Sequence, residues 1–490
     1  MLSSVLSQTR LAVVLAFVSL PWLVAVHPLQ ARGPNILFIV ADDHGPWAVG
    51  VAGNRQAFTP NLDRLAQEGA YFVNAFSVTP VCSPSRAEIM TSRYGTEVGI
   101  TEWLHPQRDR GRGLPAELLT WPELLKQAGY VTGLIGKWHL GLEDKYHPTR
   151  HGYDYFFGFR GGGNRPKDPS LEKDGQVRRF KGFTPEILTD AAIAFLEKNR
   201  DKPFALSVHF RAPHAPWLPV PEAAWEPYAS LDPALPHPDY PGLDIPRAKR
   251  MMREYLASVR SVDLNVGRLL DAVDRLGLRD STIVIYTSDH GYNMAHNGIW
   301  HKGNGHWLLK NPPPATPNIP RGQRPNLYDN SLRVPFFVRW PGVVEPGRKV
   351  TETISFLDIL PTFAAIAGAT IPKETIVRGR NFLPLLEGKK VPWDNDLYAE
   401  YSTRHQSRTH MRCYRTPEWK LVRDFLNPGR DELYHLTVDP EERHNLIDAT
   451  DPAIRAVVRA LDKRILEHME MLGDPVLELA RKRAQSAHRQ

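Results

Sequence analysis

Two apolar runs of this chain end in the same way, with aspartates soon after the last apolar residue. Residues 35–45 read NILFIVADDHG, and residues 281–291 read STIVIYTSDHG. A short apolar run bounded by polar residues is typical of a buried strand in a parallel sheet. Ligands of such sheets bind outside the carboxyl ends of the strands. If the two strands are neighbours, the pattern predicts an acidic cluster at one end of an α/β sheet.

Other segments alternate between strand and helix patterns. Apolar runs at 130–141 and 203–210 predict two more strands, and helical patterns lie at 59–69, 120–130, 187–199 and 251–277. This alternation favours a doubly wound α/β domain. From about residue 380 the pattern changes to short strands and turns, followed by a helical segment at 451–471. We therefore predict a main domain at 32–379 and a smaller α+β subdomain with an antiparallel sheet at 380–490.

The N-terminal segment has the pattern of an export signal. Arg10 ends a short polar stretch, and residues 11–26 are apolar throughout. That run is shorter than the roughly 20 apolar residues that a membrane-spanning helix needs, and Pro21 interrupts it. We expect residues 1–31 to be a signal peptide cleaved after Ala31, with Ala25 as the second choice and an uncleaved anchor as the alternative. The mature chain is then periplasmic or secreted, with no stable membrane span.

The charge balance limits the class of partner. The chain has 490 residues, with 61 basic and 54 acidic side chains and a formal net charge of +7. Spread over this length, the excess is too small to indicate nucleic-acid binding, and it is compatible with an anionic small molecule or polysaccharide. Hydrophobic residues make up 42% of the chain, which is an ordinary globular composition.

The acidic cluster is a candidate metal site. Asp42 and Asp43 follow the first strand, and Asp289 and His290 follow the second. Three carboxylates without counter-charges are costly to bury, so a divalent cation is a natural partner. Oxygen ligands favour Ca²⁺, and His290 keeps Mn²⁺ open. The alternative is that these aspartates only cap turns or helices.

The segment CSPSR at 82–86 describes an anion site that contains a nucleophile. Pro84 suits the first turn of a helix, which puts Cys82 at the positive end of the helix dipole. Arg86 lies four residues later on the same side, where its guanidinium could hold a tetrahedral oxyanion. The alternatives are a buried structural cysteine and a disulfide with Cys413, the only other cysteine in the sequence.

CSPSR followed by TSRYGTEVGI closely resembles the sulfatase signature Cys-x-Pro-x-Arg with its downstream Thr-Gly-Arg segment. The resemblance continues in order from Asn35 to about Leu446. It implies an alkaline phosphatase-like mixed sheet flanked by helices. It also implies that a maturation enzyme converts Cys82 to formylglycine (3-oxoalanine), whose hydrate is the nucleophile. The metal ligands implied are residue 82 with Asp42, Asp43, Asp289 and His290.

Further segments similar to the family imply the remaining roles. GKWHLG implies a sulfate-binding lysine at Lys137 and a histidine that contacts the hydrate at His139, and the resemblance makes Arg86 catalytic, favouring the ionised hydrate together with the metal. RAPHAPW gives His214 as the leaving-group acid, and GIWHKGNGHW gives Lys302 as the last sulfate-contacting lysine. Taken singly, each lysine could be a surface charge and each histidine a structural residue.

The resemblance implies a sulfuric ester hydrolase acting on an alcohol, sugar or aryl sulfate. Two departures bear on it: Ser92 replaces the glycine of Thr-Gly-Arg, and His290 stands where many sulfatases have Asn. The second departure favours a phosphonate monoester or phosphodiester hydrolase of the same superfamily as the alternative. A non-catalytic secreted binding protein is the third hypothesis. A proline-rich stretch at 307–326 could line the entrance to the substrate site. Four tryptophans could stack on a sugar or aryl group, namely Trp103, Trp217, Trp300 and Trp307.

Overall fold

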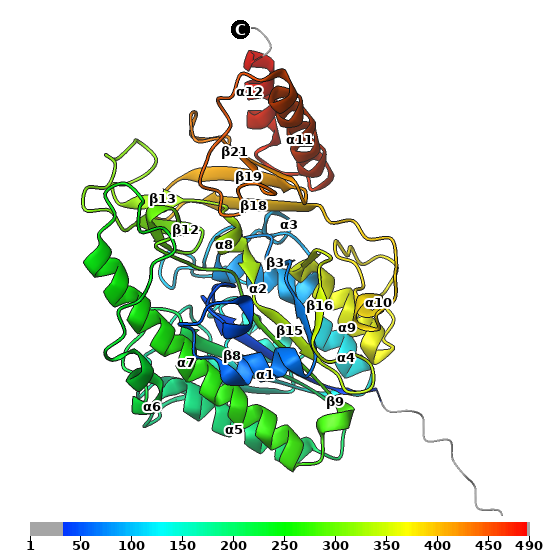
Figure 1. Ribbon diagram of the computed structural model, residues 1–490. Coiled ribbons are helices and arrows are strands. Elements are labelled where there is room, and N and C mark those ends of the chain that lie inside the picture. Colours follow the sequence, from blue (N-terminus) through cyan, green and yellow to red (C-terminus); the bar gives the residue numbers. More distant parts are fainter. Residues whose placement is uncertain (1–32, 488–490) are drawn as a thin grey trace, which may run out of the picture. The chain divides into compact units, whose positions relative to one another are not determined.

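The computed structural model describes residues 33–487 (Figure 1). The signal peptide and cleavage site expected at 1–31 lie outside the described residues. Within the described residues, no helix combines the length and the apolar character needed to cross a membrane.

A mixed sheet forms the centre of the fold. Ten strands take part in it among the described residues, in the order β16-β2-β15-β9-β1-β8-β4-β5-β6-β7. Their bounds are β16 Arg348–Val350, β2 Ala70–Phe72, β15 Phe336–Arg339, β9 Thr282–Ser288, β1 Asn35–Asp42, β8 Phe204–Pro213, β4 Val131–Lys137, β5 Tyr155–Phe159, β6 Ser170–Lys173 and β7 Gln176–Arg179. The strands from β9 to β5 in this order are parallel, whereas β15, β6 and β7 make antiparallel pairs. The four strands predicted from apolar runs are the parallel centre of this sheet.

Strand β1 lies between β8 and β9 and is buried along its whole length. Successive side chains of a strand point to opposite faces. Ile36, Phe38 and Val40 accordingly join one apolar cluster, and Leu37 and Ile39 join another. A fully apolar strand is therefore required here, because both faces of the sheet are covered.

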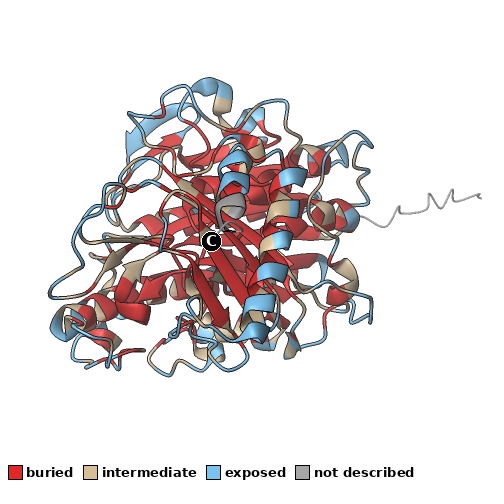
Figure 2. Cartoon of the chain, turned by 90° about the horizontal axis from the view of Figure 1, so that it is seen from above, coloured by how far each residue is buried: buried red, intermediate tan, exposed pale blue. Residues whose placement is uncertain are grey.

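Helices cover both faces. One layer contains α1 Pro60–Gln67, α5 Thr184–Asn199 and α7 Ile245–Arg275, and the other contains α2 Cys82–Thr91, α4 Trp121–Gln127 and α9 Ile359–Ala367. Figure 2 shows the buried strands between helices whose outer surfaces are exposed. This arrangement confirms the doubly wound α/β prediction.

Two smaller antiparallel sheets lie outside the central sheet. One consists of β10 Asn293–Met294, β11 Ile299–His301, β12 Asn304–Trp307 and β13 Gln323–Pro325. The other consists of β18 Leu397–Thr403, β19 Thr409–Arg415, β20 Trp419–Asp424 and β21 Glu432–His435, against which α11 Pro452–Met471 packs. The C-terminal antiparallel sheet and its helix match the sequence prediction, and a further helix, α12 Leu477–Ala487, follows them. The boundary near residue 380 stays a prediction.

Candidate active site

The acidic residues that follow β1 and β9 lie together at the carboxyl ends of these strands. Ala41 pairs with Ser288 in the parallel register, and the Asp289 N–H donates to the Ala41 carbonyl at 3.0 Å. Asp43 has a φ of 71°. Its N–H donates to Asp289 Oδ1 at 3.3 Å. The Asp42, Asp43 and Asp289 side chains are fully buried. The structure therefore brings the three predicted carboxylates into one cluster.

Cys82 is the first residue of α2 and faces this cluster. Its Sγ lies 3.6 Å from Asp42 Oδ1 and 3.5 Å from His290 Nε2. The helix ends at Thr91 because Ser92 takes the left-handed conformation, with a φ of 58°. All ten residues of α2 are buried. Both cysteines are free in the described chain, so the disulfide alternative is wrong.

Two lysines contact the same cluster from different elements. Lys137 ends β4, and its Nζ donates to Asp42 Oδ2 at 2.6 Å. Lys302 follows β11, and its Nζ donates to Asp43 Oδ1 at 2.6 Å and to Cys82 Sγ at 2.8 Å. Burial opposes the charge of Lys302, but Asp43 and the other anions outweigh it and hold its pKa well above the usual range. Both side chains are buried, so neither is a surface charge.

Arg86 holds the elements around the cluster together through its hydrogen bonds. Its Nε donates to Asp289 Oδ2 at 3.0 Å, and its Nη1 donates to the Lys137 carbonyl at 3.0 Å. It thus connects α2 with β9 and β4. In the described residues, Arg86 does not border the cavity beside Cys82. Direct contact of its guanidinium with an oxyanion remains a prediction.

The two predicted histidines reach the cavity from positions after β4 and β8. His139 Nε2 donates to the Leu104 carbonyl at 3.1 Å, so its buried Nδ1 has no proton and no partner within residues 33–487. Burial holds the pKa of His139 well below its usual range. His214 Nδ1 donates to the Ala215 carbonyl at 2.7 Å. Burial lowers the pKa of His214 to about 4.

The donor set fits a divalent cation. One ligand atom from each of Asp42, Cys82, Asp289 and His290 lies within 4.8 Å of the others, and Asp43 and His214 form a second such group with Asp42 and Cys82. Lys137, Lys302 and Arg86 already contact the three carboxylates, so charge alone does not require a metal. The stronger sign is Asp43 Oδ2, a buried carboxylate oxygen without a hydrogen-bond partner in the described chain. Oxygen donors of this kind suit a hard ion.

A cavity of about 410 Å³ opens beside Cys82, His139, His214 and Lys302. Of the four tryptophans singled out in the sequence, Trp103 is the one that borders it among the described residues. Residues 308–322 of the proline-rich stretch do not line it in the described chain. Sequence reasoning gave no role to three groups of cavity residues, which are Leu104 and Pro106, Gly161–Gly163, and His301 with Asn304.

His301 and Gly162 shape the cavity wall. His301 Nδ1 bonds to Asn304 Oδ1 at 2.7 Å, which orients the imidazole next to Lys302. A Cβ added at Gly162 would lie 2.5 Å from His139 Nε2, so only glycine leaves room for that imidazole. The sequence HKGN contains His301 and Asn304 on either side of Lys302 and Gly303, and this adjacency to Lys302 was the available signal.

The chain is similar to proteins of a known family. A family model described as Sulfatase matches residues 34–369, and a second, described as N-sulphoglucosamine sulphohydrolase, C-terminal, matches residues 323–471. Steryl-sulfatase of Rattus norvegicus is 29% identical over 567 residues, which cover 91% of this chain and 91% of the relative. N-acetylgalactosamine-6-sulfatase of Homo sapiens is 30% identical over 488 residues, which cover 90% and 86%.

A solved structure of a protein in complex with its substrate D-glucosamine-2-N,6-O-disulfate is also similar. It has a TM-score of 0.77 and 26% identity, with 91% of this chain and 99% of that chain covered. The segments that the two family models match include the acidic cluster, Cys82 and the C-terminal sheet.

Proposed function

We propose residue roles and a substrate class for this chain, which belongs to the sulfatase family and is a sulfuric ester hydrolase. The observation that carries the roles is the position of Cys82 Sγ. It lies at the end of the cavity, 2.8 Å from Lys302 Nζ and next to the carboxylate cluster. A nucleophile and an anion-binding site thus occupy the same place.

The proposed nucleophile is residue 82 after a maturation enzyme, using an oxidant of its own, has oxidised the Cys82 Cβ to the aldehyde of formylglycine with release of the sulfur. The hydrate of that aldehyde would supply the attacking oxygen. His139 would orient it through Nδ1, which is unprotonated and faces no other partner in the described chain. Arg86 would act on the site by holding Asp289 and the end of β4 in place.

The proposed metal is Ca²⁺, with Mn²⁺ as the alternative, bound by Asp42, Asp43, Asp289 and His290 together with residue 82. Such an ion would stabilise negative charge on the sulfuryl oxygens. Lys137 and Lys302, which contact Asp42 and Asp43 here, would bind the sulfate group. His214 would protonate the leaving oxygen. Burial disfavours its charged form, and an anionic sulfate ester beside it has the opposite effect.

The proposed substrate is a sulfated sugar of a glycan. The N-acetylgalactosamine-6-sulfatase relative and the complex with D-glucosamine-2-N,6-O-disulfate both have names that refer to amino sugars. Trp103 offers an aromatic surface beside the reacting atoms, of the kind that packs on a sugar ring. We also propose that the chain is exported, on the basis of its N-terminal sequence.

The competing function is hydrolysis of phosphonate monoesters or phosphodiesters, which His290 favours. We would compare kcat/KM for an aryl sulfate and a phenyl phosphonate ester, using calcium-loaded enzyme whose residue-82 aldehyde is verified by peptide mass. Cys82→Ala is the blank. A sulfate preference that disappears in the blank supports the proposal, and a phosphonate preference contradicts it. No turnover of either ester, or of a sulfated oligosaccharide, would favour the non-catalytic hypothesis.

A further inference from the structure

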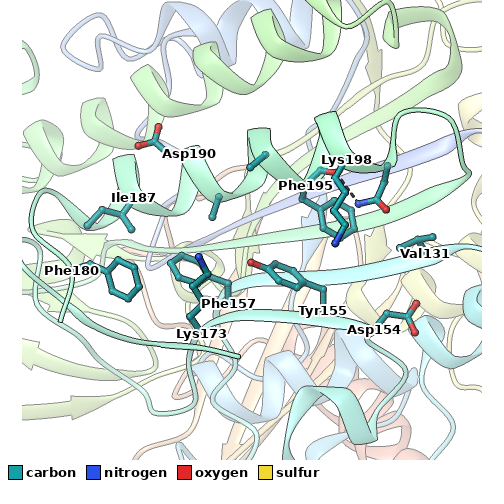
Figure 3. Close-up of a pocket in the computed structure, with 13 residues that line it drawn as sticks. Val131, Asp154, Tyr155, Phe157, Lys173, Phe180, Ile187, Asp190, Phe195 and Lys198 are labelled. Atoms are coloured by element: carbon teal, nitrogen blue, oxygen red, sulfur yellow. Dashed lines mark hydrogen bonds between the residues drawn. The ribbon is translucent and has the colours of Figure 1, made fainter. Parts of the chain in front are cut away.

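A second hollow, of about 630 Å³, lies between α5 and the sheet near β5 and β6 (Figure 3). It shares no lining residue with the cavity beside Cys82 in the described chain. Strand β4 runs from the hollow to the acidic cluster. Val131 at its start borders the hollow, and Lys137 at its end contacts Asp42. At about 3.3 Å per residue, these positions are about 20 Å apart.

The floor of the hollow is apolar and aromatic. Ile187, Ala191 and Phe195 are spaced by four residues and present one stripe of α5 to it. Tyr155 and Phe157 of β5 contribute from the sheet, and Figure 3 shows their rings beside that helix. Ile187, Ala191 and Tyr155 pack on the core and remain partly exposed. The part of this stripe at Ile187 and Ala191 is thus open to a ligand.

The rim carries an unbalanced positive charge. Its two acids are already paired: Asp154 contacts Lys126 Nζ at 2.6 Å, and Asp190 contacts Arg268. Its two lysines, Lys173 and Lys198, are exposed, and in the described part of the chain their ammonium groups have no hydrogen bond or ion pair. Two free ammonium groups therefore stand over an aromatic floor.

We propose that this hollow is a non-catalytic binding site for a sulfated sugar unit of the glycan substrate, an inference that rests on the proposed function. The apolar face of a sugar ring packs on the partly exposed rings of Tyr155 and Phe180, and sulfate oxygens accept hydrogen bonds from Lys173 and Lys198. A glycan held at both places gains apparent affinity without any new contact at the reacting atoms. The expected signature is a selective effect on polymeric substrates.

The test uses the full chain and three ligands: a 6-O-sulfated oligosaccharide, its desulfated counterpart and an aryl sulfate. Binding is also measured at increasing concentrations of sodium chloride. Lys173→Ala/Lys198→Ala removes the free charges, and Ala194→Trp fills the hollow from an exposed position on α5. Lys202→Ala/Lys310→Ala is the matched control, because it removes two exposed lysines elsewhere. Oligosaccharide binding is measured by calorimetry on the Cys82→Ala background, where no turnover occurs.

We expect the Kd of the sulfated oligosaccharide to rise about tenfold after either substitution in the hollow, because the oligosaccharide is then held only at the cavity beside Cys82. In the active enzyme, the KM for the oligosaccharide should rise about tenfold with kcat unchanged, and aryl sulfate kinetics should not change. The control should match the unsubstituted chain. The gain in affinity that the hollow provides should fall with added salt, since it depends on exposed charges.

Three outcomes overturn the inference. They are unchanged oligosaccharide binding and KM in both groove variants, equal binding of the desulfated oligosaccharide, and a dimer that Ala194→Trp dissociates in ultracentrifugation. The last would identify the hollow as an interface between copies. If the enzyme hydrolyses no sulfate ester, the proposed function fails, whereas calorimetry still decides whether the hollow binds the sulfated probe.

Discussion

Two groups of buried charges differ in how completely their bonding capacity is used. Beneath the C-terminal sheet, Asp329 accepts from Arg415 Nε at 3.0 Å and from Lys420 Nζ at 2.8 Å. Glu442 accepts from Lys420 Nζ at 2.6 Å and from the Asp329 N–H at 2.6 Å. No oxygen of these two carboxylates lacks a partner in the described chain.

The cluster around Cys82 is equally buried but has unused capacity. Asp43 Oδ2 and His139 Nδ1 have no hydrogen-bond partner among residues 33–487. His139 borders the cavity, and Asp43 lies in one candidate metal group with Cys82, which also borders it. Burial of charge is therefore not the sign of a reactive site, because both clusters have it. Unused donors and acceptors beside an open volume are the distinguishing feature.

The largest difference between the two clusters is expected when the Cys82 thiol is removed. Cys82→Ala should lower kcat by about 10⁵-fold or more, because it eliminates the proposed nucleophile. The free energy of unfolding should change by less than about 1 kcal/mol. Turnover of an aryl sulfate and urea unfolding measure the two quantities. Retained turnover would show that residue 82 is not the nucleophile.

Removal of the bound metal by a chelator should affect the cluster around Cys82 and leave the C-terminal cluster unchanged. Treatment with EDTA should lower kcat by about 10²–10³-fold, comparable to the loss of one electrostatic stabiliser. The far-ultraviolet circular dichroism should not change, and adding Ca²⁺ should restore both activity and a higher Tm. Restoration by Mn²⁺ but not Ca²⁺ would change the assignment of the metal. Full activity after chelation would contradict a metal at Asp43.

The C-terminal cluster should give the opposite result. Lys420→Met leaves Glu442 buried without a cation and leaves Asp329 with Arg415 as its remaining cation, which should cost about 3–5 kcal/mol of unfolding free energy. The kcat of the remaining folded enzyme should be unchanged. Lys349→Met, at an exposed position, is the control and should change stability by less than about 0.5 kcal/mol. A loss of kcat with unchanged stability would mean that this cluster serves the reaction.

A smaller effect is expected from the cavity wall. Gly162→Ala forces His139 to move, because the added Cβ would lie 2.5 Å from Nε2. Displacement of an orienting group by about 1 Å should lower kcat about 10- to 100-fold without unfolding the protein. Gly163→Ala is the matched control, since nothing lies within 4 Å of a Cβ there. Equal activities of the two variants would remove His139 from the proposed mechanism.

The last prediction concerns the pH dependence of stability. Glu88 of α2 is buried, and burial raises its pKa to about 8. Between its unfolded pKa of about 4.3 and pH 8, the folded chain binds a proton that the unfolded chain releases. Stability from this group therefore falls as pH rises through that window, by at most about 1.4 kcal/mol per pH unit. In Glu88→Gln the slope from pH 5 to 8 should be smaller by that amount, and an unchanged slope in urea titrations would contradict it.

Sequence reasoning was most successful where chemistry and strand pattern coincide. The strands that end at or just before Asp42, Lys137, His214 and Asp289 were predicted because each apolar run stops where polar residues begin. Helix α7 was predicted from 251 but begins at Ile245, because Asp244 caps it and Pro246 suits its first turn. Amphipathic periodicity alone does not contain that information.

The remaining features depend on contacts between distant segments. Strands β2 and β16 are too short to give an apolar pattern, and they exist because they pair with each other beside β15. Arg86 was expected to face an oxyanion, yet the position of Asp289 on another strand decides where its guanidinium points. Trp103 and His301 reach the cavity from segments whose path only the folded chain defines. Residue spacing cannot predict such positions.

The complete burial of α2 has a consequence for the order of events during synthesis. Because α2 is buried, an enzyme that oxidises residue 82 would have to reach it before the chain folds, and Lys302, whose Nζ contacts the thiol, comes 220 residues later. At ~5–20 residues per second, that interval lasts about 10 to 40 s. The proposed oxidation therefore has a limited period in which to occur, and a chain that folds first keeps an unmodified thiol in a finished site.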